Sequence, residues 1–139
     1  HDPNTLVTVG AIPFVITFGG GQPAFYSNNV DEHLDFVSVH VYPRAKHADP
    51  VEMDQLIENL AAYEIGKPML VEETSGFRSG NEVWGDFLNR STAVADGWVS
   101  QYFGSIEELE ANGDLVSLLQ KGIFEFWLSK QLELTAAAM

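Results

Sequence analysis

Two adjacent glutamates at the end of a short apolar run are the strongest candidates for chemistry in this sequence. Glu72 and Glu73 follow the run MLV at residues 69–71. A carboxylate can act as a nucleophile or as a general acid or base, and ligand sites of parallel α/β folds gather where strands end. Alternation along a strand predicts that Glu72 and Glu73 point to opposite faces, with Glu73 on the side of Met69 and Val71. Only one carboxylate is then expected in a site, and the alternative is a solvated acidic strand end.

A histidine and a tyrosine two residues apart form the second candidate. His40 and Tyr42 precede Pro43 at the end of a β-rich run, on the same face as Phe36 and Ser38. Imidazole and phenol can hydrogen-bond a carboxylate or a substrate hydroxyl. The strand that carries them and the strand before Glu73 are expected to be neighbours, so these side chains should meet. The alternative for His40 is a hydrogen-bonded core histidine.

Other patterns indicate no cofactor and no metal. The segment GGGQPA at residues 19–24 formally satisfies the dinucleotide pattern G-x-G-x-x-A, but Pro23 and the turn-forming residues after it offer no helix N-terminus for a pyrophosphate. We expect a flexible loop there. His33, His40 and His47 are evenly spaced but lie on different kinds of element. We therefore expect no cofactor and no structural metal.

Composition limits the class of protein. The chain has 139 residues, of which 45% are hydrophobic, enough for one domain with a buried core. Seven basic residues against 20 acidic ones give a net charge of −13, which repels phosphate backbones and anionic membranes. No nucleic acid and no membrane is expected as a partner, and no apolar run is long enough to span a bilayer. Cysteine is absent, which excludes disulfides, thiolate zinc sites and cysteine nucleophiles.

Short β-rich runs alternate with helical patterns, which indicates a parallel α/β architecture. Strands are expected at residues 6–10, 36–42, 69–73 and 98–103. Helices are expected after Asp49-Pro50, over residues 83–94, and from the capping box Ser105-Ile106-Glu107-Glu108 through Trp127, with a turn at Asn112-Gly113. This pattern predicts four βα units. The irregular stretch at residues 11–29 is long for a compact domain, so we expect it to be functional.

The strand-end motifs resemble those of a known enzyme clan. Residues 67–76, KPMLVEETSG, look like the seventh-strand motif of clan A glycoside hydrolases, the retaining (β/α)8 enzymes, and most like the version in endo-β-mannanases. Residues 35–43, DFVSVHVYP, resemble the sixth strand of the same clan, and residues 2–10, DPNTLVTVG, are similar to its approach to strand five. The resemblance covers nearly the whole chain in order.

The resemblance implies a fold and roles for the candidate residues. Residues 1–139 would be a single domain holding strands five to eight with their helices, which is half of a (β/α)8 TIM barrel in four parallel βα units. A complete barrel typically needs about 250 residues. Glu73 would be the catalytic nucleophile, Tyr42 would hydrogen-bond its carboxylate, and His40 would orient the substrate. The clan usually has a tryptophan sugar platform on strand eight. This chain has Gln101 at that place, so the platform is either missing or supplied by a neighbouring aromatic residue, and the substrate-binding candidates there are Trp98, Gln101, Tyr102 and Phe103.

The same resemblance implies a reaction and a missing partner. Retaining glycosidases use two carboxyl groups roughly 5 Å apart. In this clan, the acid/base glutamate follows an asparagine at the end of strand four. No residues before Leu6 could form that strand. We expect the parent enzyme to cleave β-linked oligo- or polysaccharide, β-mannan first and β-glucan next, and this chain alone to be inactive. The alternative is a non-catalytic carbohydrate-binding or scaffold domain derived from the barrel.

Two further expectations concern assembly and location. A half-barrel leaves open strand edges, which predict a homodimer or association with the missing N-terminal half. A parent that degrades polysaccharide would be secreted or periplasmic.

Overall fold

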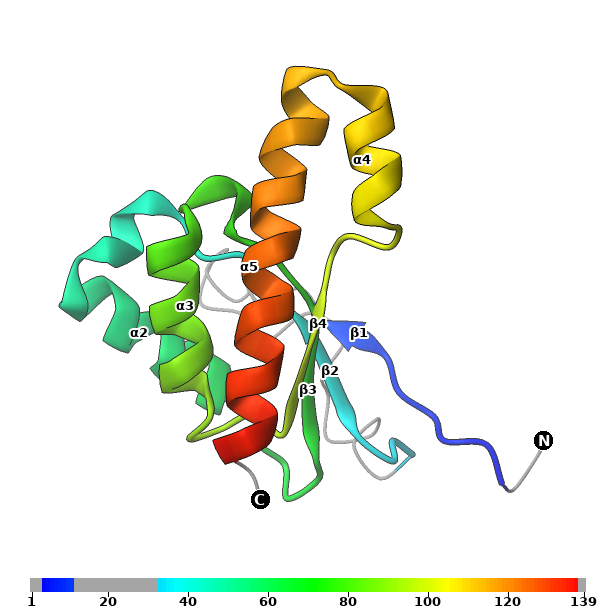
Figure 1. Ribbon diagram of the computed structural model, residues 1–139. Coiled ribbons are helices and arrows are strands. Elements are labelled where there is room, and N and C mark those ends of the chain that lie inside the picture. The colour runs from blue at the N-terminus through cyan, green and yellow to red at the C-terminus, as the bar shows by residue number, and fades with distance from the viewer. Residues whose placement is uncertain (1–3, 12–32, 138–139) are drawn as a thin grey trace.

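A computed structural model describes residues 4–11 and 33–137 of the chain (Figure 1). Its sheet is parallel, with the strand order β1-β2-β3-β4. The strands are β1 (Gly10–Ala11), β2 (Val37–His40), β3 (Met69–Thr74) and β4 (Gly97–Ser100). Because β1 contributes only two residues, β2, β3 and β4 make up the body of the sheet. The predicted α/β class with parallel strands is confirmed.

Helical elements follow each of the three longer strands. They are the 3-10 helix η2 (Ala45–Ala48), α2 (Pro50–Ala61), the 3-10 helix η3 (Gly76–Arg78), α3 (Asn81–Ser91), α4 (Ile106–Asn112) and α5 (Leu115–Ala137). The structure therefore describes three βα units. The connection after β1, with most of the long loop expected at residues 11–29, lies outside the described residues. Within the described part of the chain, no helix is long and apolar enough to cross a membrane.

Helices α2, α3 and α5 cover one face of the sheet (Figure 1). Val37 and Val39 of β2 and Val71 of β3 are completely buried beneath them, and the alternation of β2 predicted that its two valines share a face. The helices bury their own apolar side chains against these valines. The helical members of this core include Met53, Leu60, Trp84, Phe87, Leu88 and Trp127.

The predicted helix starts are confirmed. The Asp49 carboxylate accepts hydrogen bonds from the backbone N–H groups of Val51 and Glu52, and Pro50 is the first residue of α2. Ser105 and Glu108 form the expected capping box of α4. Gly113 ends α4 with a φ of 63°, a conformation that glycine adopts without strain. The helical spacing expected through Trp127 is also confirmed, since α5 continues to Ala137.

Three expected strands are shorter in the structure: those at residues 6–10, 36–42 and 98–103 are observed as β1 (Gly10–Ala11), β2 (Val37–His40) and β4 (Gly97–Ser100). Residues 6–9 run beside the start of β2 without joining it: the Val7 N–H donates to the Asp35 carboxylate at 2.7 Å, and the Thr8 hydroxyl donates to the Phe36 carbonyl. At the other edge, β4 ends at Ser100, where the Gln101 N–H makes its last bond to the Thr74 carbonyl. Side-chain hydrogen bonds thus join residues 7 and 8 to the start of β2, whereas a backbone bond joins Gln101 to the end of β3.

Candidate functional site

A cluster of polar side chains lies where β2 and β3 end. His40 Nδ1 is 3.1 Å from Glu73 Oε2, and His40 Nε2 is 2.8 Å from Glu72 Oε1. The Tyr42 hydroxyl donates a hydrogen bond to Glu73 Oε1. The expected meeting of His40, Tyr42 and Glu73 is therefore confirmed, while their catalytic roles remain predictions. We call His40, Tyr42, Glu72 and Glu73 the strand-end cluster.

The expectation that Glu72 points away from Glu73 is wrong, because β3 contains a β-bulge. Val71 pairs with Val39, but the next pair along β2 is His40 with Glu73, so β3 has one extra residue. The pairing of β3 with β4 shows the same extra residue, because Val71 pairs with Trp98 and Thr74 pairs with Ser100. A bulge leaves one residue unpaired and turns its side chain, so alternation fails across it. Glu72 and Glu73 consequently reach the same imidazole.

The bulge also reverses which side chains of β3 face the helices. Alternation from Val71 would place residue 73 on the helix-covered face. The structure instead buries Thr74 there, where its hydroxyl accepts a hydrogen bond from the indole N–H of Trp84 at 3.0 Å. Thr74 therefore takes the buried position that strict alternation assigns to Glu73, and Glu73 is free to face His40 and Tyr42.

Gly10 of β1 provides the space for Glu72. A Cβ atom at Gly10 would collide with Glu72 Oε1 and lie 3.2 Å from His40 Nε2. The sequence predicted only that Gly10 ends a strand. The space that Gly10 leaves is filled by a side chain of β3 next to a side chain of β2. A local sequence pattern could not have revealed this contact.

The strand-end cluster is accessible to solvent. The side chains of His40, Glu72 and Glu73 are 30%, 28% and 32% exposed. Each side chain is thus held by hydrogen bonds and still open to a ligand. Within the described ranges, no group of three or more histidine or acidic side chains is arranged to hold a metal ion.

The four substrate-binding candidates of strand eight do not gather around Glu73. Trp98 faces the helices, where its indole N–H donates to the Ser91 hydroxyl of α3 at 2.9 Å. Tyr102 packs edge-on against Phe124 of α5 and hydrogen-bonds the Ser105 carbonyl. Phe103 is fully exposed. Their assignment to a sugar site stays a prediction.

Gln101 and Tyr102 line a small hollow at the strand ends. Its volume is about 220 Å³, and its wall includes Ser75, which directly follows β3. The other lining residues are Phe77, Ser100, Val116, Gln120 and Ile123. The hollow is too small for more than a portion of a sugar chain, because ligand pockets commonly measure about 300–1,000 Å³.

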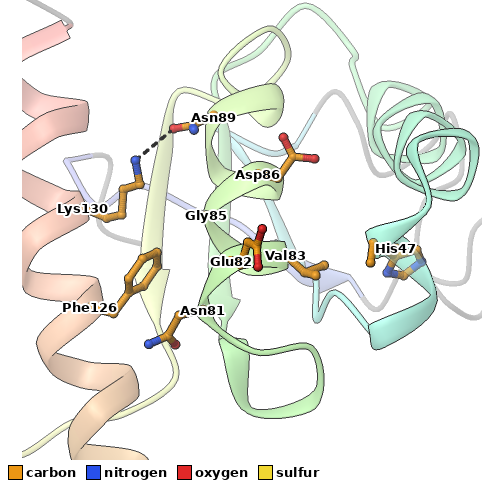
Figure 2. A pocket seen from close by; sticks show the side chains of 10 residues that line it. His47, Asn81, Glu82, Val83, Gly85, Asp86, Asn89, Phe126 and Lys130 are labelled. Atoms are coloured by element: carbon orange, nitrogen blue, oxygen red, sulfur yellow. Dashed lines mark hydrogen bonds between the residues drawn. The ribbon is translucent and has the colours of Figure 1, made fainter.

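A larger groove of about 560 Å³ runs along α3, between η2 and α5 (Figure 2). It is not lined by any member of the strand-end cluster. Polar and charged side chains dominate its wall, with Phe126 as the aromatic member. Its lining includes His47, Asn81, Glu82, Asp86, Asn89, Phe126 and Lys130. Sequence patterns gave no sign of this groove, because its wall is assembled from three separate elements.

His47 at the end of this groove differs from His40 in its surroundings. It is buried, and its Nδ1 accepts a hydrogen bond from the Arg44 backbone N–H at 2.8 Å. Burial, followed by the positive charge of Lys46, lowers the pKa of the His47 imidazole below its ordinary value. Because Nδ1 accepts the Arg44 N–H, the neutral His47 imidazole carries its proton on Nε2.

The chain matches no protein-family model, curated protein or solved structure. A function must therefore be argued from the residues and their geometry.

Proposed function

We propose that this chain is the C-terminal half of a (β/α)8 retaining glycoside hydrolase that cleaves β-linked polysaccharide, β-mannan first and β-glucan next. The observation that supports it is the environment of Glu73. Its Oε1 accepts a hydrogen bond from the Tyr42 hydroxyl, and its Oε2 lies 3.1 Å from His40 Nδ1. Glu73 stands near the carboxyl end of a parallel strand. The Tyr42 hydrogen bond on one oxygen and the imidazole beside the other hold the carboxylate in one orientation.

In the proposed reaction, a Glu73 oxygen attacks the anomeric carbon of the sugar. The C–O bond to the leaving sugar breaks, and the leaving oxygen takes a proton from a general acid. Water then gives a proton to the same group, now a base, and its hydroxyl replaces Glu73 on the sugar. Tyr42 and His40 hold the carboxylate in one orientation through both steps.

Glu72 is not assigned the role of general acid. It lies at Nε2 of the imidazole, while Glu73 lies at Nδ1, so the His40 ring stands between the two carboxylates. A general acid must instead face the nucleophile across the glycosidic bond. We propose that this acid comes from strand four of the complete barrel. General acid catalysis contributes about 10²- to 10⁴-fold, so the isolated chain should be nearly inactive.

The arrangement of the sheet supports a half-barrel. Its strands are parallel and in sequential order, helices cover one face, and the strand-end cluster lies on the other side of β2 and β3. In a closed barrel, helices surround the strands and catalytic residues stand at the carboxyl ends of strands. The outer strands of the described sheet are β1 and β4.

The proposed nucleophile can be tested in the complete parent enzyme. Glu73→Gln should lower kcat on mannan by about 10⁴-fold or more, because a neutral amide cannot form the glycosyl intermediate. Glu64→Gln, at an exposed position before β3, is the matched control and should retain turnover. A 2-deoxy-2-fluoro-β-mannosyl inactivator should label the peptide with Glu73, as detected by mass spectrometry.

Three results would oppose this proposal. Near-normal turnover by Glu73→Gln would exclude Glu73 as the nucleophile. Robust hydrolysis by the isolated chain would exclude an acid from strand four. Saturable binding of mannan without labelling or turnover in the longest natural form of the protein would instead favour a non-catalytic carbohydrate-binding domain.

The proposed half-barrel should associate through its outer strands. On their outer edges, β1 and β4 have backbone N–H and C=O groups that pair with no other strand of the described sheet. Such groups favour the addition of another strand. We expect a homodimer, or a complex with the N-terminal half when both are present. Light scattering measures the mass directly, and a stable monomer at high concentration would contradict this expectation.

A further inference from the structure

We propose that Glu72 is a positioning residue, which acts on Glu73 through the imidazole of His40. This inference rests on the proposed role of Glu73 but concerns a residue that neither the motif nor strand alternation placed in the site. The structure puts Glu72 on His40 Nε2 at 2.8 Å, with Glu73 on Nδ1 at 3.1 Å. Both ring nitrogens are therefore engaged by carboxylates.

Counting hydrogen-bond donors shows why the second carboxylate matters. An ionised carboxylate only accepts, and a neutral imidazole has one donor and one acceptor nitrogen. A neutral His40 could satisfy one ionised glutamate but would turn a lone pair toward the other. The two contacts therefore require one more proton, either on the ring or on a carboxyl group. Charge-assisted bonds of this kind are the strong ones.

The additional proton allows His40 to present an Nδ1–H donor to Glu73. In the arrangement with this proton on the ring, Nε2–H donates to Glu72 Oε1 and Nδ1–H faces Glu73 Oε2, so the ring is held between the two carboxylates. Tyr42 donates to Glu73 Oε1 at the same time. When Glu73 becomes a neutral ester in the proposed reaction, Glu72 remains as the counter-ion of the imidazole. Glu72 thus keeps the charge beside the reacting oxygen balanced.

Two independent backbone features place Glu72 in this position. The β-bulge turns it onto the same side as Glu73, as the register of β3 with both β2 and β4 requires. Gly10 then leaves room for its carboxylate next to His40 Nε2. A glycine in a strand commonly marks a close approach by another group.

Nuclear magnetic resonance on the isolated chain tests this inference without any substrate. In the wild type, the ¹⁵N shifts of both His40 ring nitrogens should report bound or shared protons. In Glu72→Gln, the amide can donate to Nε2, so only Nδ1 should report a proton. His47 is an internal control, because its Nδ1 accepts from Arg44 and it should keep a proton on Nε2 alone in every variant.

A second variant leaves both glutamates in place. Gly10→Ala should reproduce the Glu72→Gln spectrum, since the new methyl group displaces the Glu72 carboxylate, which is the far end of a flexible side chain. Gly122→Ala is the matched control, because a Cβ there meets nothing within 4 Å. A wild-type His40 spectrum in Glu72→Gln, or in Gly10→Ala, would overturn the inference.

Kinetics of the complete enzyme separate this inference from the proposed function. Glu72→Gln should lower kcat by about 10²-fold with KM little changed, the cost of a misplaced reacting group. Full turnover in Glu73→Gln, with the His40 spectrum altered in Glu72→Gln, would refute the proposed function alone. Loss of turnover in Glu73→Gln, with an unaltered His40 spectrum in Glu72→Gln, would refute the role of Glu72 alone.

Discussion

The two faces of the sheet use the same strands for different purposes. On the helix-covered face, Val37, Val39 and Val71 are completely buried among apolar helix residues. On the opposite face, the side chains of His40 and Glu73 remain about 30% exposed, with His40 Nδ1 3.1 Å from Glu73 Oε2. One face excludes water and stabilises the fold, and the other carries partly exposed ionisable groups.

A parallel strand can carry buried core residues and exposed ionisable residues within a few positions of each other. Val71 belongs to the buried face, and the very next residues of β3 turn two carboxylates to the open face before Thr74 returns to the core. The bulge makes this change within four residues. Substitutions on the two faces should therefore separate stability from function.

Neighbouring residues of β3 provide the largest expected contrast in stability. Met69 is 2% exposed in the helix-side core, whereas Leu70 is half-buried on the opposite face. Met69→Ala should lower the free energy of unfolding by about 2–5 kcal/mol, and Leu70→Ala by less than half of that. Urea denaturation measures both values. Equal losses would show that the open face is packed as tightly as the core.

A smaller effect is expected where the bulge returns β3 to the core. Thr74→Val keeps the shape of the side chain but removes the hydroxyl that accepts the Trp84 indole N–H. An unsatisfied buried donor costs about 1–3 kcal/mol, and denaturation should detect this loss. The same change should leave the His40 spectrum as it is in the wild type. An altered spectrum would mean that the two faces are coupled through the bulge.

The smallest effect is expected from His47, the buried counterpart of His40. Burial lowers its pKa in the folded state below the ordinary value of 6.5. The unfolded chain therefore binds more protons at His47 in that pH range, so stability should decrease as pH falls below about 6.5. His47→Gln should make unfolding less dependent on pH over this interval. An unchanged pH dependence in thermal melts would contradict this expectation.

Several elements of the fold could be predicted because their signals are local. Asp49-Pro50 and Ser105 with Glu108 satisfy backbone groups within one turn of their own helix, so the residues alone identify the helix starts. The alternation of β2 likewise predicted which of its residues share a face, but Val37 and Ser38, on opposite faces, are both completely buried. Strand ends were less predictable, since Val7 bonds the Asp35 side chain in place of a strand neighbour.

The strand-end cluster was predicted only in part. The sequence predicted that His40, Tyr42 and Glu73 lie close together. They occupy the carboxyl ends of two strands, and the ends of neighbouring parallel strands lie at the same edge of a sheet. The sequence excluded Glu72, because alternation assumes an uninterrupted strand. It also assigned no role to Gly10, which contacts residues far away in the chain.

The helix caps, the succession of β and helical segments along the chain and the acidic strand end follow from the amino-acid sequence alone, since each depends on neighbouring residues or on simple periodicity. Only the tertiary structure decided that β3 bulges and that both glutamates face His40. A bulge is defined by the register of one strand against its two neighbours, and space at Gly10 is defined by a side chain from another strand. Such relations exist only when distant segments pack together.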